Sequence, residues 1–253
     1  MNLKAVICAG LLVIGVSSSA KAASPEAEVK ALLEKVDALW YGSKSHAEVR
    51  MTVKTSRYTR QMELEYWIKG DRFTLIRINA PAKERGTATL KVGLDIFNYL
   101  PKIDRTVKIS QALLSGAWMG SHFTNDDLTR SSRLSKDFAA RLIKEEKAKE
   151  DTIWTIELTP NDKVALPYSQ IVLVMNKTAV QPISQSFFDS GKTIIRTVTY
   201  HDLKDLGGAK VPSVVRVEPA GATGEMTELT YIKINREVDL PDEFFSLAKI
   251  KTL

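Results

Sequence analysis

Residues 61–78 read QMELEYWIKGDRFTLIRI and contain two apolar runs separated by a glycine. The apolar positions of the first run alternate with polar ones and are Met62, Leu64, Tyr66 and Ile68. Gly70 then supplies a tight turn, and residues 72–78 run back as a second apolar stretch. Because successive side chains of a strand point to opposite faces, this pattern predicts an antiparallel hairpin with one apolar face.

The same pattern recurs along most of the chain. Further strands are predicted at residues 47–53, 86–92, 94–100, 105–109, 152–159, 170–175, 181–188, 193–200, 211–218 and 226–235. Turn signals separate several of them, including the adjacent Gly207 and Gly208. About 11 short strands, mostly joined by hairpins, predict a mainly β fold whose antiparallel sheet is long enough to curl into a barrel or part-barrel.

Two regions depart from the β pattern. Ser24 and Pro25 suit the N-cap and the first position of a helix over residues 24–42. Its apolar stripe has helical spacing and consists of Val29, Leu32, Leu33, Val36, Leu39 and Trp40. Residues 111–150 interrupt the strands, and LSKDFAARLIKEEKAKE at 134–150 reads as a charged helix. The sequence thus predicts one helix at the start of the mature chain and a helical insertion in its middle.

The first 22 residues have the pattern of a signal peptide. Lys4 precedes the apolar run AVICAGLLVIGV at residues 5–16, which is too short to span a membrane, and an A-K-A cleavage pattern ends at Ala22. We therefore expect an exported mature protein that forms one domain over residues 23–253. The only cysteine, Cys8, lies in the signal peptide, so disulfides, thiol nucleophiles and thiolate metal sites are not expected in the mature chain.

The charge of the chain is only mildly basic. The formal net charge is +6, and removal of Lys4 and Lys21 with the signal peptide leaves 34 basic against 30 acidic residues, or +4. This small excess argues little for nucleic-acid binding and is compatible with a weak attraction to anionic lipid surfaces.

Residues 118–128, WMGSHFTNDDL, combine large apolar side chains with a histidine and two aspartates. With Thr124 as the N-cap, its hydroxyl can bond the amide of Asp127, and the Asp127 carboxylate can reach back, as in a capping box with Asp in place of Glu. Phe123 and Leu128 occupy the two positions of a hydrophobic staple. This interpretation makes the acids the start of a helix and requires no metal.

The apolar side chains around this motif have two interpretations. They lie in a loop punctuated by Gly116 and Gly120 and are Leu113, Leu114, Trp118, Met119 and Phe123. They form either a fixed plug of core residues or a movable lid over an apolar cavity, since Met and aromatic side chains adapt to variable apolar partners.

Catalytic signals are weak. The three histidines, His46, His122 and His201, have no metal-binding spacing, and neither a nucleophile elbow nor a phosphate-binding glycine loop is present. We therefore predict a protein without catalytic residues, metal or cofactor. A hydrolase that uses His122 with Asp126 or Asp127 is kept as a further hypothesis.

The opening helix, the long β-run, the insertion and the motif SGAWMGSHFTNDDL at 115–128 together resemble the LolA-like superfamily, in particular its outer-membrane lipoprotein-sorting branch. The resemblance covers essentially the whole mature chain. It implies a mainly β fold with α: an incompletely closed antiparallel β-barrel of about 11 strands, covered by an N-terminal helix and a mid-chain helical lid.

The resemblance also implies a function. A monomeric periplasmic carrier of this kind holds the acyl chains of lipoproteins, or other apolar lipid cargo, in a concave cavity and ferries them towards the outer membrane. Its partners would be the lipidated cargo, an inner-membrane transporter as donor and an outer-membrane acceptor. The alternative is a periplasmic accessory protein that binds an exporter of the efflux or lipid-transport type.

Candidate cavity residues come from strand alternation and from the motif. They are Leu64, Tyr66, Ile68, Trp118, Met119, Phe123, Trp154, Ile156 and Leu158. Alternation separates two faces of a sheet without showing which is concave, so ordinary core packing is the alternative at each position.

Overall fold

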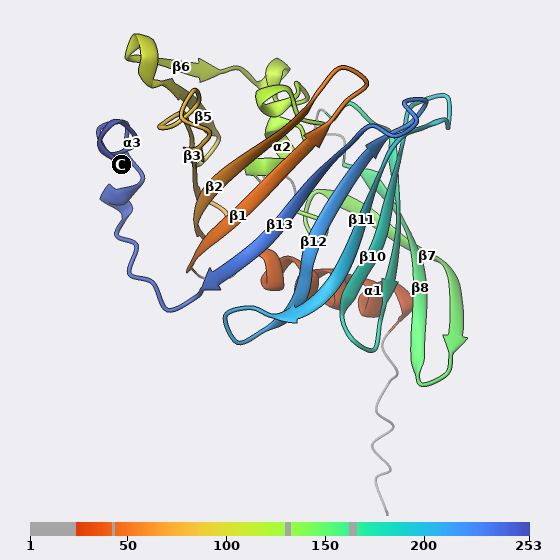
Figure 1. Ribbon diagram of the computed structural model, residues 1–253. Coiled ribbons are helices and arrows are strands. Elements are labelled where there is room, and N and C mark those ends of the chain that lie inside the picture. Colours follow the sequence, from red (N-terminus) through yellow and green to blue (C-terminus); the bar gives the residue numbers. More distant parts are fainter. Residues whose placement is uncertain (1–23, 42–43, 130–132, 162–165) are drawn as a thin grey trace, which may run out of the picture.

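The computed structural model describes residues 24–41, 44–129, 133–161 and 166–253. Thirteen strands form one antiparallel sheet (Figure 1). They are β1 (Lys44–Lys54), β2 (Thr59–Lys69), β3 (Phe73–Ala80), β4 (Ala88–Val92), β5 (Asp95–Leu100), β6 (Arg105–Ile109), β7 (Phe138–Ala148), β8 (Asp151–Pro160), β9 (Gln170–Asn176), β10 (Gln181–Phe188), β11 (Ile194–Asp205), β12 (Lys210–Pro219) and β13 (Met226–Asn235).

The strand order consists of two meanders joined at the centre. It runs β6-β5-β4-β3-β2-β1-β13-β12-β11-β10-β9-β8-β7, so β1 pairs with β13 and the edges are β6 and β7. The edges do not pair with each other, and the sheet is therefore open rather than closed into a barrel. The mainly β fold and the antiparallel sheet are confirmed, whereas the predicted count of about 11 strands is too low.

The additional strand is β7, where the sequence predicted a helix. Ala, Lys, Glu and Arg favour helices, but Phe138, Ala140 and Leu142 turn towards the core, and β7 pairs with β8 throughout its length. Tertiary pairing thus overrides local propensity. The charged second half of β7 suits an edge strand, since exposed charges discourage pairing with another chain.

Helix α1 (Pro25–Tyr41) forms as predicted and lies against one face of the sheet (Figure 1). Ser24 caps it, with its hydroxyl accepting from the amide of Ala27 at 3.3 Å. The predicted stripe is buried at Val29, Leu32, Leu33 and Val36, all in the main hydrophobic core. Leu39 is half-buried, and the side chain of Trp40 is outside the described part of the chain.

The mid-chain insertion is less helical than predicted. Residues 110–137, here called the connecting segment, lead from edge strand β6 to edge strand β7. Their helical parts are short: η2 (Gln111–Leu113), η3 (Trp118–Gly120) and α2 (Asn125–Thr129). The predicted helical lid is therefore wrong in detail, because the described parts of this segment, residues 110–129 and 133–137, are mostly irregular and contain one short α-helix.

A second core lies on the other face of the sheet, which the sequence analysis did not predict. After β13, the chain continues through η4 (Asp242–Phe244) and α3 (Lys249–Thr252) and covers β2 to β5. Leu240, Phe245 and Ile250 are buried there against Trp67 and its neighbours. This terminal stretch, residues 236–253, is here called the C-terminal cover. The sheet is consequently apolar on both faces in this region.

Within the described ranges, no helix is both long and apolar enough to cross a membrane. The predicted signal peptide falls in residues 1–22, outside the described residues, and the single-domain prediction stays a prediction.

Candidate ligand cavity

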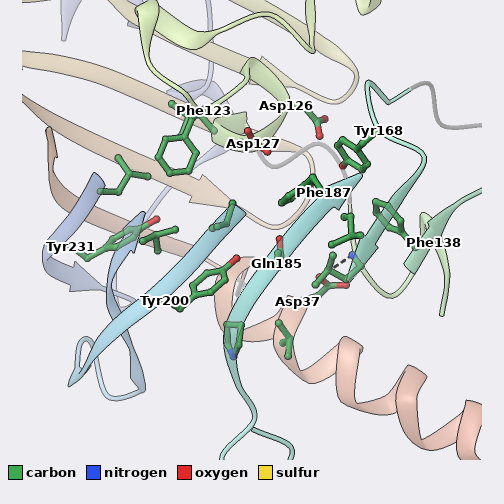
Figure 2. A pocket seen from close by; sticks show the side chains of 18 of the residues that line it. Asp37, Phe123, Asp126, Asp127, Phe138, Tyr168, Gln185, Phe187, Tyr200 and Tyr231 are labelled. Carbon is green, nitrogen blue, oxygen red and sulfur yellow. Dashed lines mark hydrogen bonds between the residues drawn. The ribbon is translucent and has the colours of Figure 1, made fainter. Parts of the chain in front are cut away.

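A cavity of about 170 Å³ lies between α1, the connecting segment and the curved face of the sheet. Strands β2 and β9 to β13 supply most of its walls, and α2 supplies another. Seven aromatic residues line it together with aliphatic ones: Tyr66, Phe123, Phe138, Tyr168, Phe187, Tyr200 and Tyr231. Figure 2 shows the rings of Phe123, Phe138, Tyr168, Phe187, Tyr200 and Tyr231 around the cavity. A few polar groups accompany them: Asp37, Asp126, Asp127 and Gln185. Ligand sites for apolar molecules commonly have this composition.

The start of α2 is fixed by the predicted capping box. The Asp127 amide donates to the Thr124 hydroxyl at 3.0 Å, and the Thr124 amide donates to the Asp127 carboxylate at 2.7 Å. Phe123 and Leu128, the predicted staple positions, are both buried and line the cavity. The capping interpretation is confirmed, and it places α2 as one wall of the cavity.

An ion pair joins this wall to the sheet. Arg196 of β11 donates to both carboxylate oxygens of Asp127, with Nη2 2.9 Å from Oδ1. The Arg196 guanidinium also lies 4.1 Å from the Phe187 ring centroid. Burial raises the pKa of Asp127, but Arg196 and the hydrogen bonds from Thr124 outweigh burial and hold the pKa below 3.8. The pair is therefore charged at neutral pH.

A second carboxylate holds α1 in place. Asp37 is only 3% exposed, and it accepts from the Ser135 amide at 2.9 Å and from the Ser135 hydroxyl at 2.6 Å. The Leu134 amide adds a longer bond of 3.3 Å. These bonds join α1 to the last part of the connecting segment. Two acid-centred contacts, at Asp127 and Asp37, thus position the two elements that enclose the cavity.

The predicted cavity residues are all buried or half-buried, but only some line the cavity. Tyr66 and Phe123 line it, and Tyr66 also lines a smaller hollow of about 20 Å³ together with Ile68. The remaining six lie in or against the main core: Leu64, Trp118, Met119, Trp154, Ile156 and Leu158. The strand positions among these residues lie on the buried side, and the ligand-binding role of all nine residues stays a prediction.

Trp118 is held as a core residue. Its side chain is 1% exposed, and its indole N–H donates to the Thr89 hydroxyl at 2.9 Å. Arg60 donates to the carbonyl of Met119, and the Tyr58 hydroxyl donates to that of Gly120 at 3.3 Å. The first part of the connecting segment is thus anchored to the sheet. Residues 123–128, rather than Trp118, form the cavity wall.

His122 has partners other than those of the hydrolase hypothesis. Its Nδ1 is 2.9 Å from the Thr227 hydroxyl, and its Nε2 is 3.4 Å from the Glu225 carboxylate. Asp127 pairs instead with Arg196. Among the described residues there is no group of three or more His, Cys, Asp or Glu side chains arranged to hold a metal. The motif at 118–128 therefore positions a wall of the cavity and shows no converging catalytic geometry.

The sequence analysis missed the two groups that hold the walls, Arg196 and Asp37. A signal for Arg196 was present, because it shares one face of residues 193–200 with Val198 and Tyr200. A charge on an apolar strand face requires a partner when that face is buried. The identity of the partner depends on the tertiary fold, since Asp127 is 69 residues away.

Comparisons with solved structures find the same fold in LolA-like proteins. A LolA superfamily protein from Nitrosomonas europaea is 23% identical, with a TM-score of 0.74 over 87% of this chain and 97% of its own. A putative outer membrane lipoprotein-sorting protein domain from Vibrio parahaemolyticus is 24% identical, with a TM-score of 0.75 over 88% and 97%. A DUF1329 family protein from Desulfovibrio piger is 18% identical, with a TM-score of 0.80 over 90% and 100%.

These similarities define the class: the chain has a LolA-like fold, and the predicted resemblance is confirmed at that level. By sequence, residues 70–252 match a family model described as "-like: Uncharacterized protein", and the chain belongs to this family. No curated protein sequence matches the chain.

Proposed function

We propose that this protein is a periplasmic carrier that binds acyl chains of lipoproteins or other apolar lipid cargo and ferries them towards the outer membrane. The proposal includes export with cleavage of residues 1–22, and a role in binding rather than catalysis. The observation that carries it is the aromatic-lined cavity between α1, α2 and the curved sheet. The lipoprotein-sorting description of the structural neighbour from Vibrio parahaemolyticus supports it.

The energetics of acyl transfer favour such a cavity. Burial of an acyl chain of about 15 methylenes is worth roughly 12 kcal/mol, at about 0.8 kcal/mol per methylene, so a free chain does not cross water readily. Carrying one requires an apolar surface that replaces the membrane interior. The same surface must open again at the acceptor, because cargo that is held too tightly is not delivered.

The volume of the cavity indicates how it would open. An apolar cavity of about 150 Å³ holds a benzene-sized ligand. The 170 Å³ present here accommodates a short part of an acyl chain, and a whole chain requires a wall to move. The wall at residues 123–128 is joined to the sheet by the Asp127–Arg196 pair. Cargo entry would therefore break this pair and move α2 away from β11.

Native mass spectrometry of the protein purified from its own periplasm tests the proposal. Organic extraction and lipid analysis of the same sample would identify any bound species. We expect a stoichiometric acylated ligand. A ligand-free mass that stays unchanged after incubation with lipids and lipopeptides would overturn the carrier function and favour the alternative of an exporter-binding protein.

A matched pair of variants on β12 localises the binding. Val215 lines the cavity and is 7% exposed, whereas its neighbour Val214 is 8% exposed and points to the other face. Val215→Phe should reduce lipid loading, because the larger ring fills the cavity. Val214→Phe should load normally at a similar cost in stability, roughly 1–3 kcal/mol for overpacking. Equal loading by both variants would place the cargo elsewhere.

A further inference from the structure

The cavity is the first of three adjacent hollows beneath the second half of α1. Tyr66 and Tyr231 line both the main cavity and the hollow of about 20 Å³. Leu39 and Arg236 line both that hollow and an open cleft of about 840 Å³. The three hollows are thus neighbours, and each is separated from the next by the side chains that they share. The cleft volume lies within the range of about 300–1,000 Å³ that is typical of ligand sites.

The open cleft is basic. Three lysines and an arginine line it, from α1, β1, β12 and the chain after β13: Lys35, Lys44, Lys210 and Arg236. No acidic residue lines it among the described residues. Lys44 has a weak ion pair with Asp239, at 3.8 Å, and Asp239 is 95% exposed. The cleft therefore concentrates positive charge in a protein whose overall charge is nearly balanced.

Two of these cations are more available to a ligand than the others. Arg236 donates to the Leu39 carbonyl at 3.3 Å, near the negative end of the α1 dipole, so part of its charge offsets the helix terminus. Lys44 is partly neutralised by Asp239. Lys35 and Lys210 are both exposed and come from different elements that line the cleft, α1 and β12. An anion bound in the cleft would draw mainly on these two lysines.

The remaining walls of the cleft are amphipathic. Leu39, Val180 and Leu203 supply apolar surface. Gln181 is 7% exposed, and its amide N–H₂ donates to the Lys210 carbonyl at 2.7 Å. The amide oxygen of Gln181 is buried without a hydrogen-bond partner among the described residues. Because this oxygen is almost wholly inaccessible, Gln181 supports the Lys210 backbone and does not offer the ligand a contact.

We propose that this cleft binds the headgroup of an anionic glycerophospholipid whose acyl chain extends through the small hollow into the aromatic cavity. The phosphate would bind Lys35 and Lys210. A lipid fits better than a free phosphate, because the basic cleft has apolar walls at Leu39, Val180 and Leu203 and adjoins the hollows of the apolar interior. This inference rests on the proposed carrier function and specifies its cargo as a lipid with a negatively charged headgroup.

Two probes with the same acyl chain test the headgroup site. Binding of monoacyl phosphatidylglycerol and of monoacyl phosphatidylcholine to the full mature chain is measured by calorimetry below the micelle-forming concentrations. We expect the glycerol lipid to bind about tenfold more tightly, as two partly screened charge contacts would give. In Lys35→Gln/Lys210→Gln the ratio of affinities should fall to about one.

The matched control is Lys83→Gln/Lys102→Gln, which removes two exposed lysines in the β3–β4 and β5–β6 connections. It changes the net charge equally and should preserve the tenfold ratio. Thermal unfolding of both double variants verifies that they fold. Glycerol phosphate is added as a competitor in a separate titration, and it should displace the lipid only weakly.

Each outcome separates the headgroup site from the carrier function. A ratio near one in the unmodified protein, or an unchanged ratio in Lys35→Gln/Lys210→Gln, would overturn the headgroup site while leaving the carrier function intact. Competition by glycerol phosphate as strong as by the whole lipid would show a site for soluble phosphates instead. Failure of both lipids to bind would overturn the carrier function, and the headgroup site with it.

Discussion

Two apolar surfaces on opposite faces of the same sheet are covered in different ways. On the outer face, the C-terminal cover fills the surface of β2 to β5 with its own side chains, including Phe245, whose ring lies 4.9 Å from that of Phe73. On the inner face, α1 and α2 cover the strands but leave the aromatic cavity between them. The C-terminal cover thus fills the outer surface of β2 to β5, whereas the inner face retains a cavity.

The filled surface under the C-terminal cover shows that the chain has enough apolar side chains to close such a surface. The cavity on the inner face therefore does not result from a shortage of them. At roughly 24 cal/mol per Å³, an unfilled volume of 170 Å³ forgoes as much as about 4 kcal/mol of stability. A chain that fills one face completely is able to fill the other. Two acids on the inner face tie α2 to the sheet and α1 to the connecting segment around this space, which favours a function for the space that they enclose.

The largest effect is expected on the filled face. Phe245→Ala removes a ring that is 3% exposed and should lower the free energy of unfolding by about 4 kcal/mol. Urea denaturation measures the loss. Lipid loading of the folded fraction should not change, because the cavity lies on the other side of the sheet. Loss of loading in a folded Phe245→Ala protein would contradict the separation of the two faces.

A somewhat smaller loss is expected at the wall of the cavity. Arg196→Met leaves the Asp127 carboxylate without its partner and should cost about 3 kcal/mol, as for other buried pairs that lose one member. Arg216→Met is the matched control, because its pair with Glu228 lies on the same sheet with 37% of the Arg216 side chain exposed. Exposed pairs contribute less than about 1 kcal/mol.

The same two variants distinguish a fixed wall from one that opens. Apolar dye or lipid should enter Arg196→Met faster than the unmodified protein, since the contact that holds α2 to β11 is gone. Arg216→Met should admit it at the unmodified rate. Equal entry rates would show that cargo takes a route other than the displacement of α2.

The strands were predictable because their information is local. Hairpin turns and alternation located twelve strands within a few residues, and Trp154, Ile156 and Leu158 were assigned to the buried face correctly. β7 was not predictable in this way, since the Ala, Lys and Glu of residues 139–148 favour a helix in isolation. Only pairing with β8, which is a tertiary contact, makes it a strand.

The candidate site likewise has a local part that could be predicted from the sequence and a tertiary part that could not. The Thr124–Asp127 capping box spans four residues and was read from the sequence. The partner of Asp127 lies on β11, and the aromatic lining is gathered from β2, β7, β10, β11 and β13 and from the chain just before α2 and β9. The C-terminal cover was missed because its short apolar stretches have no periodicity and acquire meaning only against the outer face of the sheet.

Acid should weaken the contact that joins α2 to the sheet. The pKa of Asp127 is held below 3.8 in the folded chain, so the unfolded chain binds its proton more readily. The stabilisation is therefore present above the ordinary Asp pKa and is lost as the pH falls through the lower, folded value. A pH titration of unfolding free energy in the acid range should show this loss, and Asp127→Asn should flatten it. The same slope in both proteins would assign the pH dependence to other carboxyls.

The smallest effect compares one methylene at the hollow with one in the filled core. Ile171 lines the cavity and is 2% exposed, whereas Ile250 is 1% exposed and lies in the core of the outer face. Ile250→Val should cost about 1 kcal/mol, because the surrounding side chains cannot follow the missing group. Ile171→Val should cost less, about 0.5 kcal/mol, because that methylene already faces a space with few neighbours to lose. The Ile171→Val variant should also bind lipid at least as well as the unmodified protein, since the substitution enlarges the cavity. Equal costs, measured by urea denaturation, would mean that the inner face is as tightly filled as the outer one, and the comparison between the two faces would fail.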